Sequence, residues 1–93
     1  MSQEVIALKL STGEEIIARV KAREDYFVLD RPNLIGLAPH PDGRGVGIQM
    51  MPWLASNQAG EVKVTYSHIV AETEPHEDLV KGYLKQTTGI ELA

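Results

Sequence analysis

Histidine, serine and glycine-rich segments are the parts of this sequence that could do chemistry, but none has the spacing that catalysis or metal binding requires. The serines lack the strand, sharp turn and helix that surround an activated serine nucleophile. Residues 43–47 are rich in glycine, but they lack the lysine of a phosphate-binding loop and precede a predicted strand instead of a helix. The histidines are scattered, with no pair spaced to share one helix face: His40, His68 and His76. We therefore predict no enzyme activity, no cofactor and no metal site.

Length, charge and cysteine content restrict the class of protein further. The chain has 93 residues, no cysteine, and a net charge of −4 from 9 basic and 13 acidic side chains. This length suits one domain and is too short for separate cofactor and substrate domains. The lack of cysteine fits a cytoplasmic protein, and the net charge argues against general binding of duplex nucleic acid. No apolar stretch approaches the roughly 18 residues of a membrane span, and residues 1–4 do not resemble a signal peptide.

The first third of the chain predicts β structure. Residues 5–10 and 15–23 alternate between apolar and polar side chains around Gly13, which is typical of a β-hairpin with one buried face. A third strand begins at Tyr26. Pro32 has no amide hydrogen to donate, so it should lie at an edge, a bulge or a sharp bend, after which residues 34–37 resume strand character.

The remaining residues predict further strands and one helix. Two prolines and two glycines place a loop at residues 39–45, and a strand follows over residues 46–53, with a polar loop at 54–60. Strands at 62–66 and from 69 onward flank a break at Ser67 and His68. A helix is expected over about residues 76–86, with acids in its first turn and a stop at residues 87–89. The sum is a mainly β domain, either a small barrel or a bent sheet, with a C-terminal helix.

The first hairpin carries a more specific pattern. It has two apolar strand residues, a turn glycine, a small residue five positions later, an acidic residue before the third strand and a large apolar residue three later: Leu8, Leu10, Gly13, Ala18, Glu24 and Phe27. This pattern resembles the first conserved motif of the Sm and Sm-like proteins. Val28 stands where the family usually has an asparagine that contacts RNA bases.

A second segment resembles the other family motif. Bacterial Hfq has Tyr-Lys-His between its last two strands, followed by a short apolar strand and a proline. Here the order is Tyr66-Ser67-His68, residues 69–71 and Pro75, so a serine replaces the lysine. The Arg-Gly of eukaryotic and archaeal members is missing. Over about residues 4–75 the chain thus resembles a divergent Sm-like protein, of the kind also found in phage genomes.

The resemblance implies a fold and an assembly. The fold is a small, strongly bent five-stranded open barrel of the SH3 type, at about residues 4–75 of a single domain 1–93, with the helix added after it. Sm-like domains form closed homo-oligomeric rings in which the last two strands, here Val62–Tyr66 and Ile69–Thr73, pair between subunits. Such pairing would remove two exposed strand edges. The alternative is a monomeric barrel whose edge is covered by the helix.

The resemblance also implies a site. Family members bind single-stranded RNA through the loop before the third strand and the turn between the last two strands, which here correspond to Arg23, Glu24, Asp25, Tyr26, Tyr66, Ser67 and His68. Tyrosine rings in this set could stack on unpaired bases of RNA or of single-stranded DNA. Core or edge packing is the alternative role for these rings. The alternative function is an oligomeric protein–protein interaction or assembly module with no nucleic-acid role.

Overall fold

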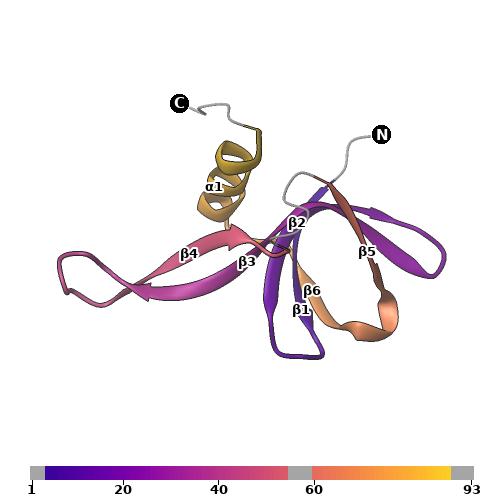
Figure 1. Cartoon of the computed structure of the whole chain (residues 1–93), viewed down its shortest axis with the longest axis horizontal. Coiled ribbons are helices and arrows are strands. Elements are labelled where there is room, and N and C mark those ends of the chain that lie inside the picture. Colours follow the sequence, from indigo (N-terminus) through magenta and orange to yellow (C-terminus); the bar gives the residue numbers. More distant parts are fainter. Residues whose placement is uncertain (1–3, 55–59, 89–93) are drawn as a thin grey trace.

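A computed structural model describes residues 4–54 and 60–88 and has a mainly β architecture with one C-terminal helix, as predicted (Figure 1). Residues 55–59 of the predicted 54–60 loop lie outside the described part. The elements in chain order are β1 (Glu4–Leu10), β2 (Glu15–Ala22), β3 (Tyr26–Pro39), β4 (Val46–Pro52), β5 (Glu61–Thr65), the 3₁₀ turn η1 (Tyr66–His68), β6 (Ile69–Thr73) and α1 (Glu77–Thr88).

The described strands form one antiparallel sheet in the order β4-β3-β2-β1-β6, and β5 pairs with β3. β3 runs along β2 on one edge, while its other edge pairs with β5 near the start and with β4 near the end. The described sheet has six strands, one more than the predicted five, and it is not closed into a barrel. The additional strand fits because β3 is long enough to accept two partners along one edge.

The β1–β2 hairpin forms where the sequence predicted it. Gly13 has a φ of +98°, a conformation that residues with a Cβ rarely adopt, and its amide donates to the Leu10 carbonyl at 2.9 Å. Leu8 pairs with Ile16 across the hairpin, and both side chains are buried. Burial of alternate residues on one face holds this register, since a shift by one residue would expose every buried side chain.

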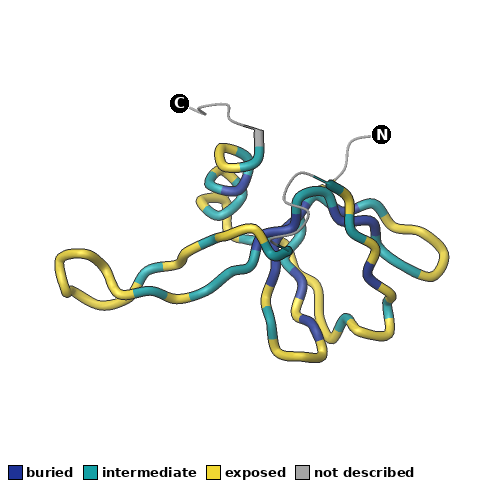
Figure 2. Tube along the Cα trace, in the orientation of Figure 1, coloured by how far each residue is buried: buried dark blue, intermediate teal, exposed yellow. Residues whose placement is uncertain are grey.

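One apolar cluster forms the core and lies on what we call the inner face of the sheet (Figure 2). Its buried members come from four strands and are Leu8, Leu10, Ile16, Ala18, Val20, Leu29 and Val64. Ile17 is also fully buried, although it alternates with Ile16 and Ala18 and so lies on the opposite, outer face. Both faces of β2 are thus covered at this point, and α1 contacts the same strand through Tyr83.

The β2–β3 ladder contains the bulge that Pro32 predicted. Ile17 pairs with Asn33 and Arg19 with Asp30, so Arg31 and Pro32 together oppose one residue of β2. Arg31 adopts a φ of +48°, in the left-handed region, as residues at bulges can do. β3 changes partner at the same place, since Asp30 is the last residue paired with β5 and Asn33 the first paired with β4.

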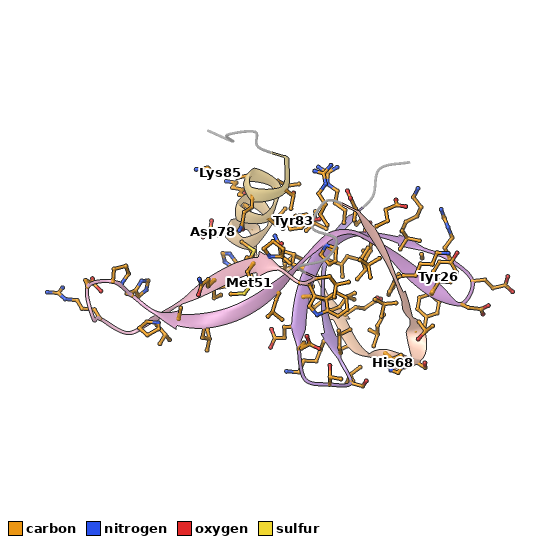
Figure 3. All side chains as sticks on the ribbon, in the orientation of Figure 1. Tyr26, Met51, His68, Asp78, Tyr83 and Lys85 are labelled. Carbon is orange, nitrogen blue, oxygen red and sulfur yellow. The ribbon has the colours of Figure 1, made fainter. Side chains whose placement is uncertain are left out.

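Helix α1 docks on this bulge through Tyr83. The Tyr83 side chain is 0% exposed, and its hydroxyl accepts a hydrogen bond from the Arg19 amide at 3.1 Å and donates one to the Asp30 carbonyl. Gly82 lies against Met50 of β4, because a Cβ placed on Gly82 would come within 2.9 Å of the Met50 Cε. The helix therefore crosses the outer face where β2, β3 and β4 meet (Figures 1 and 3).

The helix ends later than predicted. It continues through Thr87 and Thr88, where the sequence predicted a stop. The Thr87 hydroxyl donates to the Tyr83 carbonyl at 2.8 Å, and the Arg31 guanidinium donates to the Thr87 carbonyl. The arginine supplies a partner for a carbonyl that the last turn of a helix otherwise leaves unsatisfied, and the threonine bonds back to the preceding turn. No helix in the described part of the chain has the length and apolar character needed to cross a membrane.

We predict that Tyr83→Phe destabilises the fold by roughly 1–3 kcal/mol, because it removes the buried hydroxyl that bridges two partly buried backbone groups. Burial and the nearby Asp30 charge raise the pKa of Tyr83 above its ordinary value. The wild-type protein should therefore keep this stabilisation below about pH 10 and lose it as the pH rises through the folded-state pKa. Urea unfolding of both proteins from pH 7 to 11 measures the effect. The prediction is wrong if Tyr83→Phe is as stable as the wild type at pH 7, or if both proteins lose the same amount of stability as the pH rises.

Candidate nucleic-acid interface

The turn between β2 and β3 contains the first group of predicted site residues. β2 ends at Ala22 and β3 begins at Tyr26, so Arg23, Glu24 and Asp25 form the connection. The Arg23 amide donates to the Tyr26 carbonyl at 2.8 Å, which closes the turn. The side chains of residues 23–25 are all exposed, as expected for a solvated turn.

The second predicted group forms η1 between β5 and β6. Because Tyr26 pairs with Thr65, the residue after Thr65 lies next to the β2–β3 turn. The Tyr66 amide donates to the Asp25 carbonyl at 3.3 Å, and the Tyr66 hydroxyl donates to the Arg23 carbonyl. Two segments about 40 positions apart in the chain are thus brought together, with Tyr66 as the link.

The tyrosines at this site already have partners. The Tyr66 ring packs edge-on against Phe27, with ring centroids 4.8 Å apart and an angle of 81° between the planes. The Lys63 ammonium lies 5.4 Å from the centre of the Tyr26 ring, within the range of a cation–π contact. The Tyr66 ring is therefore used in packing against Phe27, whereas the half-buried Tyr26 ring lies next to the Lys63 ammonium.

Lys63 is a residue that sequence reasoning missed. It alternates with Val62 and Val64 in β5, so its outward position could have been predicted. Its approach to Tyr26 depends on the β3–β5 pairing, which joins residues far apart in the chain. Lys21 occupies the same row, since both lysines pair with Val28 from opposite sides. Cross-strand partners project to the same face, so Lys21, Lys63 and Tyr26 share the outer face of the sheet.

Ser67 and His68 have different neighbours from the rest of the predicted site. The His68 carbonyl accepts a hydrogen bond from the Ser11 amide at 2.8 Å, which places this end of η1 beside the β1–β2 turn (Figure 3). The Ser67 hydroxyl lies 3.4 Å from that of Thr65. Both side chains at positions 67 and 68 are exposed. The structure therefore joins Arg23, Asp25, Tyr26 and Tyr66 through direct contacts or strand pairing, but not His68.

This arrangement is suited to binding. It combines the half-buried Tyr26 ring, the Lys63 ammonium over that ring and Lys21 in the same row with the exposed side chains of the adjoining turn. The ring can stack on a base and the cations can contact phosphates, whereas Glu24 and Asp25 oppose phosphate. Among the described residues, no three His, Asp or Glu side chains come together in a way that could hold a metal ion.

A separate polar contact lies beside the middle of β3, where β4 ends. The Glu14 carboxylate accepts hydrogen bonds from the Thr12 hydroxyl at 2.7 Å and from the Trp53 indole at 2.8 Å. These two bonds favour the ionised form and lower the pKa of Glu14 below its ordinary value. Glu14 is therefore a fixed negative charge at the base of the β3–β4 hairpin.

Comparison with known proteins identifies no relative: no family model and no curated protein matches this sequence. The function is consequently inferred from the motifs and from the geometry of the site.

We predict that Tyr66→Phe weakens the link between η1 and the β2–β3 turn, because it keeps the packing on Phe27 and removes the bond to the Arg23 carbonyl. The expected loss of stability is roughly 0.5–1.5 kcal/mol, with faster hydrogen exchange of amides in residues 23–26. Tyr26→Phe is the matched control, since no hydrogen bond of the Tyr26 hydroxyl is found in the described residues. Equal exchange rates in wild type and Tyr66→Phe would disprove the link.

Proposed function

We propose that this chain is a Sm-like protein that assembles into a closed ring and binds single-stranded RNA, or single-stranded DNA, without catalysis. The observation that carries the proposal is the contact of Tyr66 with the carbonyls of Arg23 and Asp25. The two segments that bind RNA in the family are the two that meet here. If each short motif resembled the family only by chance, the two motifs would have no reason to be in contact in the folded chain.

The edges of the sheet support a ring. In the described residues, β5 pairs only with β3 and β6 only with β1, so each strand has a free edge. Unpaired edges are open to strands of other chains. β5 and β6 are the strands that the family resemblance pairs between neighbouring subunits. Val70 of β6 is an apolar side chain that is 68% exposed, and burial in such an interface would remove it from water.

The chemistry of the outer face supports a single-stranded ligand. Tyr26 offers a ring for a base, and Lys63 and Lys21 lie in the same region to contact phosphates. Base stacking on an aromatic side chain contributes roughly 1–3 kcal/mol, and it requires a base free of its duplex partner. Arg23 at the turn adds an exposed cation beside the same strands, whereas Lys21 is half-buried.

A second candidate function, an assembly module without nucleic acid, also has specific support. Tyr66 is committed to Phe27 and to the Arg23 carbonyl, so it is not free to stack on a base. Glu24 and Asp25 place two exposed carboxylates in the turn, where they repel phosphates. The ring and the nucleic-acid site are therefore tested separately.

The ring is tested by the mass of the protein in solution. Light scattering of the wild-type protein should give at least three times the chain mass of 10.2 kDa. Val70→Glu should lower the mass because it places a charge in the proposed interface, whereas the β-branched Val70→Thr should keep it. A wild-type mass of one or two chains would refute the ring.

Nucleic-acid binding is tested by fluorescence anisotropy with labelled oligo-U, oligo-A and oligo-dT at low and moderate salt. We expect a dissociation constant below about 100 μM for at least one of them, the weak limit of non-specific binding. Tyr26→Leu should weaken binding about fivefold or more, given the energy of one stacked base. Lys63→Ala and Arg23→Ala should also weaken it, while Lys81→Ala on α1 is the control for lost charge. A ring that binds none of the oligonucleotides would favour the assembly module.

A further inference from the structure

The β3–β4 hairpin projects from the rest of the molecule and meets the β1–β2 hairpin at a corner. We call residues 34–51, which comprise the second half of β3, β4 and their connecting loop, the arm (Figure 1). Most of its length is exposed (Figure 2). β2 begins at Glu15, which pairs with Ile35, so among the described residues β3 continues into the arm without a partner strand on this edge. We call the space between this unpaired part of β3 and the β1–β2 turn the corner.

A pocket of about 290 Å³ occupies the corner. Four large apolar side chains line it, together with two glutamates and two glycines: Leu34, Ile35, Leu37, Ile48, Glu14, Glu15, Gly13 and Gly36. A Cβ placed on either glycine would meet no atom within 4 Å, so the pocket is open beside both of them. Pockets for whole small molecules are usually about 300–1,000 Å³, so this one suits a short segment of a larger ligand.

The apolar side of the pocket is uncovered. Ile35 and Leu37 alternate along β3, and Leu37 pairs with Ile48, so all three project to the outer face of the sheet. Helix α1 reaches this face of the arm at its base, where Gly82 lies against Met50. Beyond that contact Leu37 is 74% exposed and Ile48 is 56% exposed. Exposed apolar surface concentrated in this way is typical of an interaction site.

The edge of β3 at the corner also offers unpaired backbone groups. The Trp53 amide donates to the Pro32 carbonyl, so even-numbered residues of this part of β3 bond to β4. The direction of hydrogen bonding alternates along a strand, so Leu37 directs its amide and its carbonyl away from β4 and toward the corner. The pairing of β2 ends at Glu15 and supplies no partner for them. An extended peptide can hydrogen-bond to such an edge, whereas the hydrocarbon of a lipid surface cannot.

Two carboxylates make the pocket negative. Glu15 pairs with Ile35 and shares the outer face with it. The Glu15 carboxylate lies 3.6 Å from the Lys9 ammonium, and 57% of the Glu15 side chain stays exposed. Glu14 is the fixed negative charge described above. Two acids against one neighbouring cation attract a positive group and repel phosphate, so the corner is not an extension of the nucleic-acid interface.

The start of β2 restricts which part of a peptide can occupy the corner. A segment that bonds to Leu37 lies in line with β2, so it has to end or turn away where Glu15 begins to pair with β3. Glu14 and Glu15 line the pocket at that point. A free amino terminus brings a positive charge to these two carboxylates, whereas a free carboxyl terminus would bring a negative charge.

We infer that the corner binds the free amino terminus of a partner protein whose first residue has an aliphatic side chain. The ammonium meets the carboxylates of Glu14 and Glu15, the first side chain packs on Leu37 and Ile48, and the backbone pairs with the edge of β3. The segment runs parallel to β3, from the corner toward the tip of the arm. Among the described residues, none that belongs to β5, β6 or the Tyr26 site lines the corner, so this inference does not depend on the proposed ring or on nucleic acid.

Titration with a tripeptide tests the inference. The amide of Leu-Ser-Val has a free ammonium and an aliphatic first residue, and its N-acetylated form differs by the loss of the charge. The free peptide should shift the methyl NMR signals of Ile35, Leu37 and Ile48 with a dissociation constant below about 10 mM, as suits one aliphatic contact and one exposed ion pair. The acetylated peptide should bind about threefold more weakly or not at all. Equal binding of the two peptides, or no saturable shift with the free one, would overturn the inference.

Two variants, each with a matched control, separate the apolar contact from the charge. Leu37→Thr should weaken binding of the free peptide about fivefold, whereas Val46→Thr should not, because Val46 is also exposed on the arm but does not line the pocket. Glu15→Gln should weaken binding about threefold, with Glu61→Gln on β5 as the control for lost charge. Equal binding by Leu37→Thr and Val46→Thr contradicts the site. Corner signals that shift when the protein alone is diluted would mean that a second copy occupies the corner, which also overturns the inference.

Discussion

The bridge between the Tyr83 hydroxyl and the β2–β3 bulge is the constraint on which the arrangement of this molecule depends. Pro32 cannot donate to a ladder and Arg31 is in the left-handed region, so regular pairing fails between Asp30 and Asn33. Tyr83 supplies a donor and an acceptor at that point, and the Arg31 guanidinium reaches back to the last turn of α1. The helix and the irregularity in the sheet thus stabilise one another: without the bulge the hydroxyl would lack its two partners, and without Tyr83 the bulge would be left open to water.

The same bulge separates two regions with different chemistry. Before it, β3 pairs with β5 and brings the polar site at Tyr26 and Tyr66 together; after it, β3 pairs with β4 and forms the apolar arm. The end of β4 and the start of β5 are both bonded to the bulge itself. The Trp53 amide donates to the Pro32 carbonyl, and the Arg31 amide donates to the Gly60 carbonyl. One long strand therefore fixes the position of the site relative to the arm, so a change at the bulge should affect both.

The sequence predicted the features that depend on near neighbours. Gly13 marked the hairpin turn and Pro32 the bulge, because each acts through its own backbone conformation. It did not predict that residues 34–39 and 46–52 would extend as an exposed arm, since alternation with period two does not say which strand will be covered. The helix end was missed because a threonine that bonds back to the preceding turn can remain helical. The contact of Tyr66 with Arg23, and the role of Tyr83, depend on tertiary placement that the local pattern does not contain.

The distribution of charge among the free edges distinguishes β5 and β6 from β4. In the proposed ring, β5 of one subunit pairs with β6 of the next, and these strands carry acids and a lysine. The charges of the two strands must therefore be complementary in the register that forms. This requirement favours one defined closed arrangement. β4 carries no charged side chain, so the protection of its edge has to come from other groups. Two are present near its end: Pro52 has no amide hydrogen to donate, and Gln86 of α1 donates to the outward carbonyl of Met50. The helix that rests on the bulge therefore also covers part of the edge that the bulge creates.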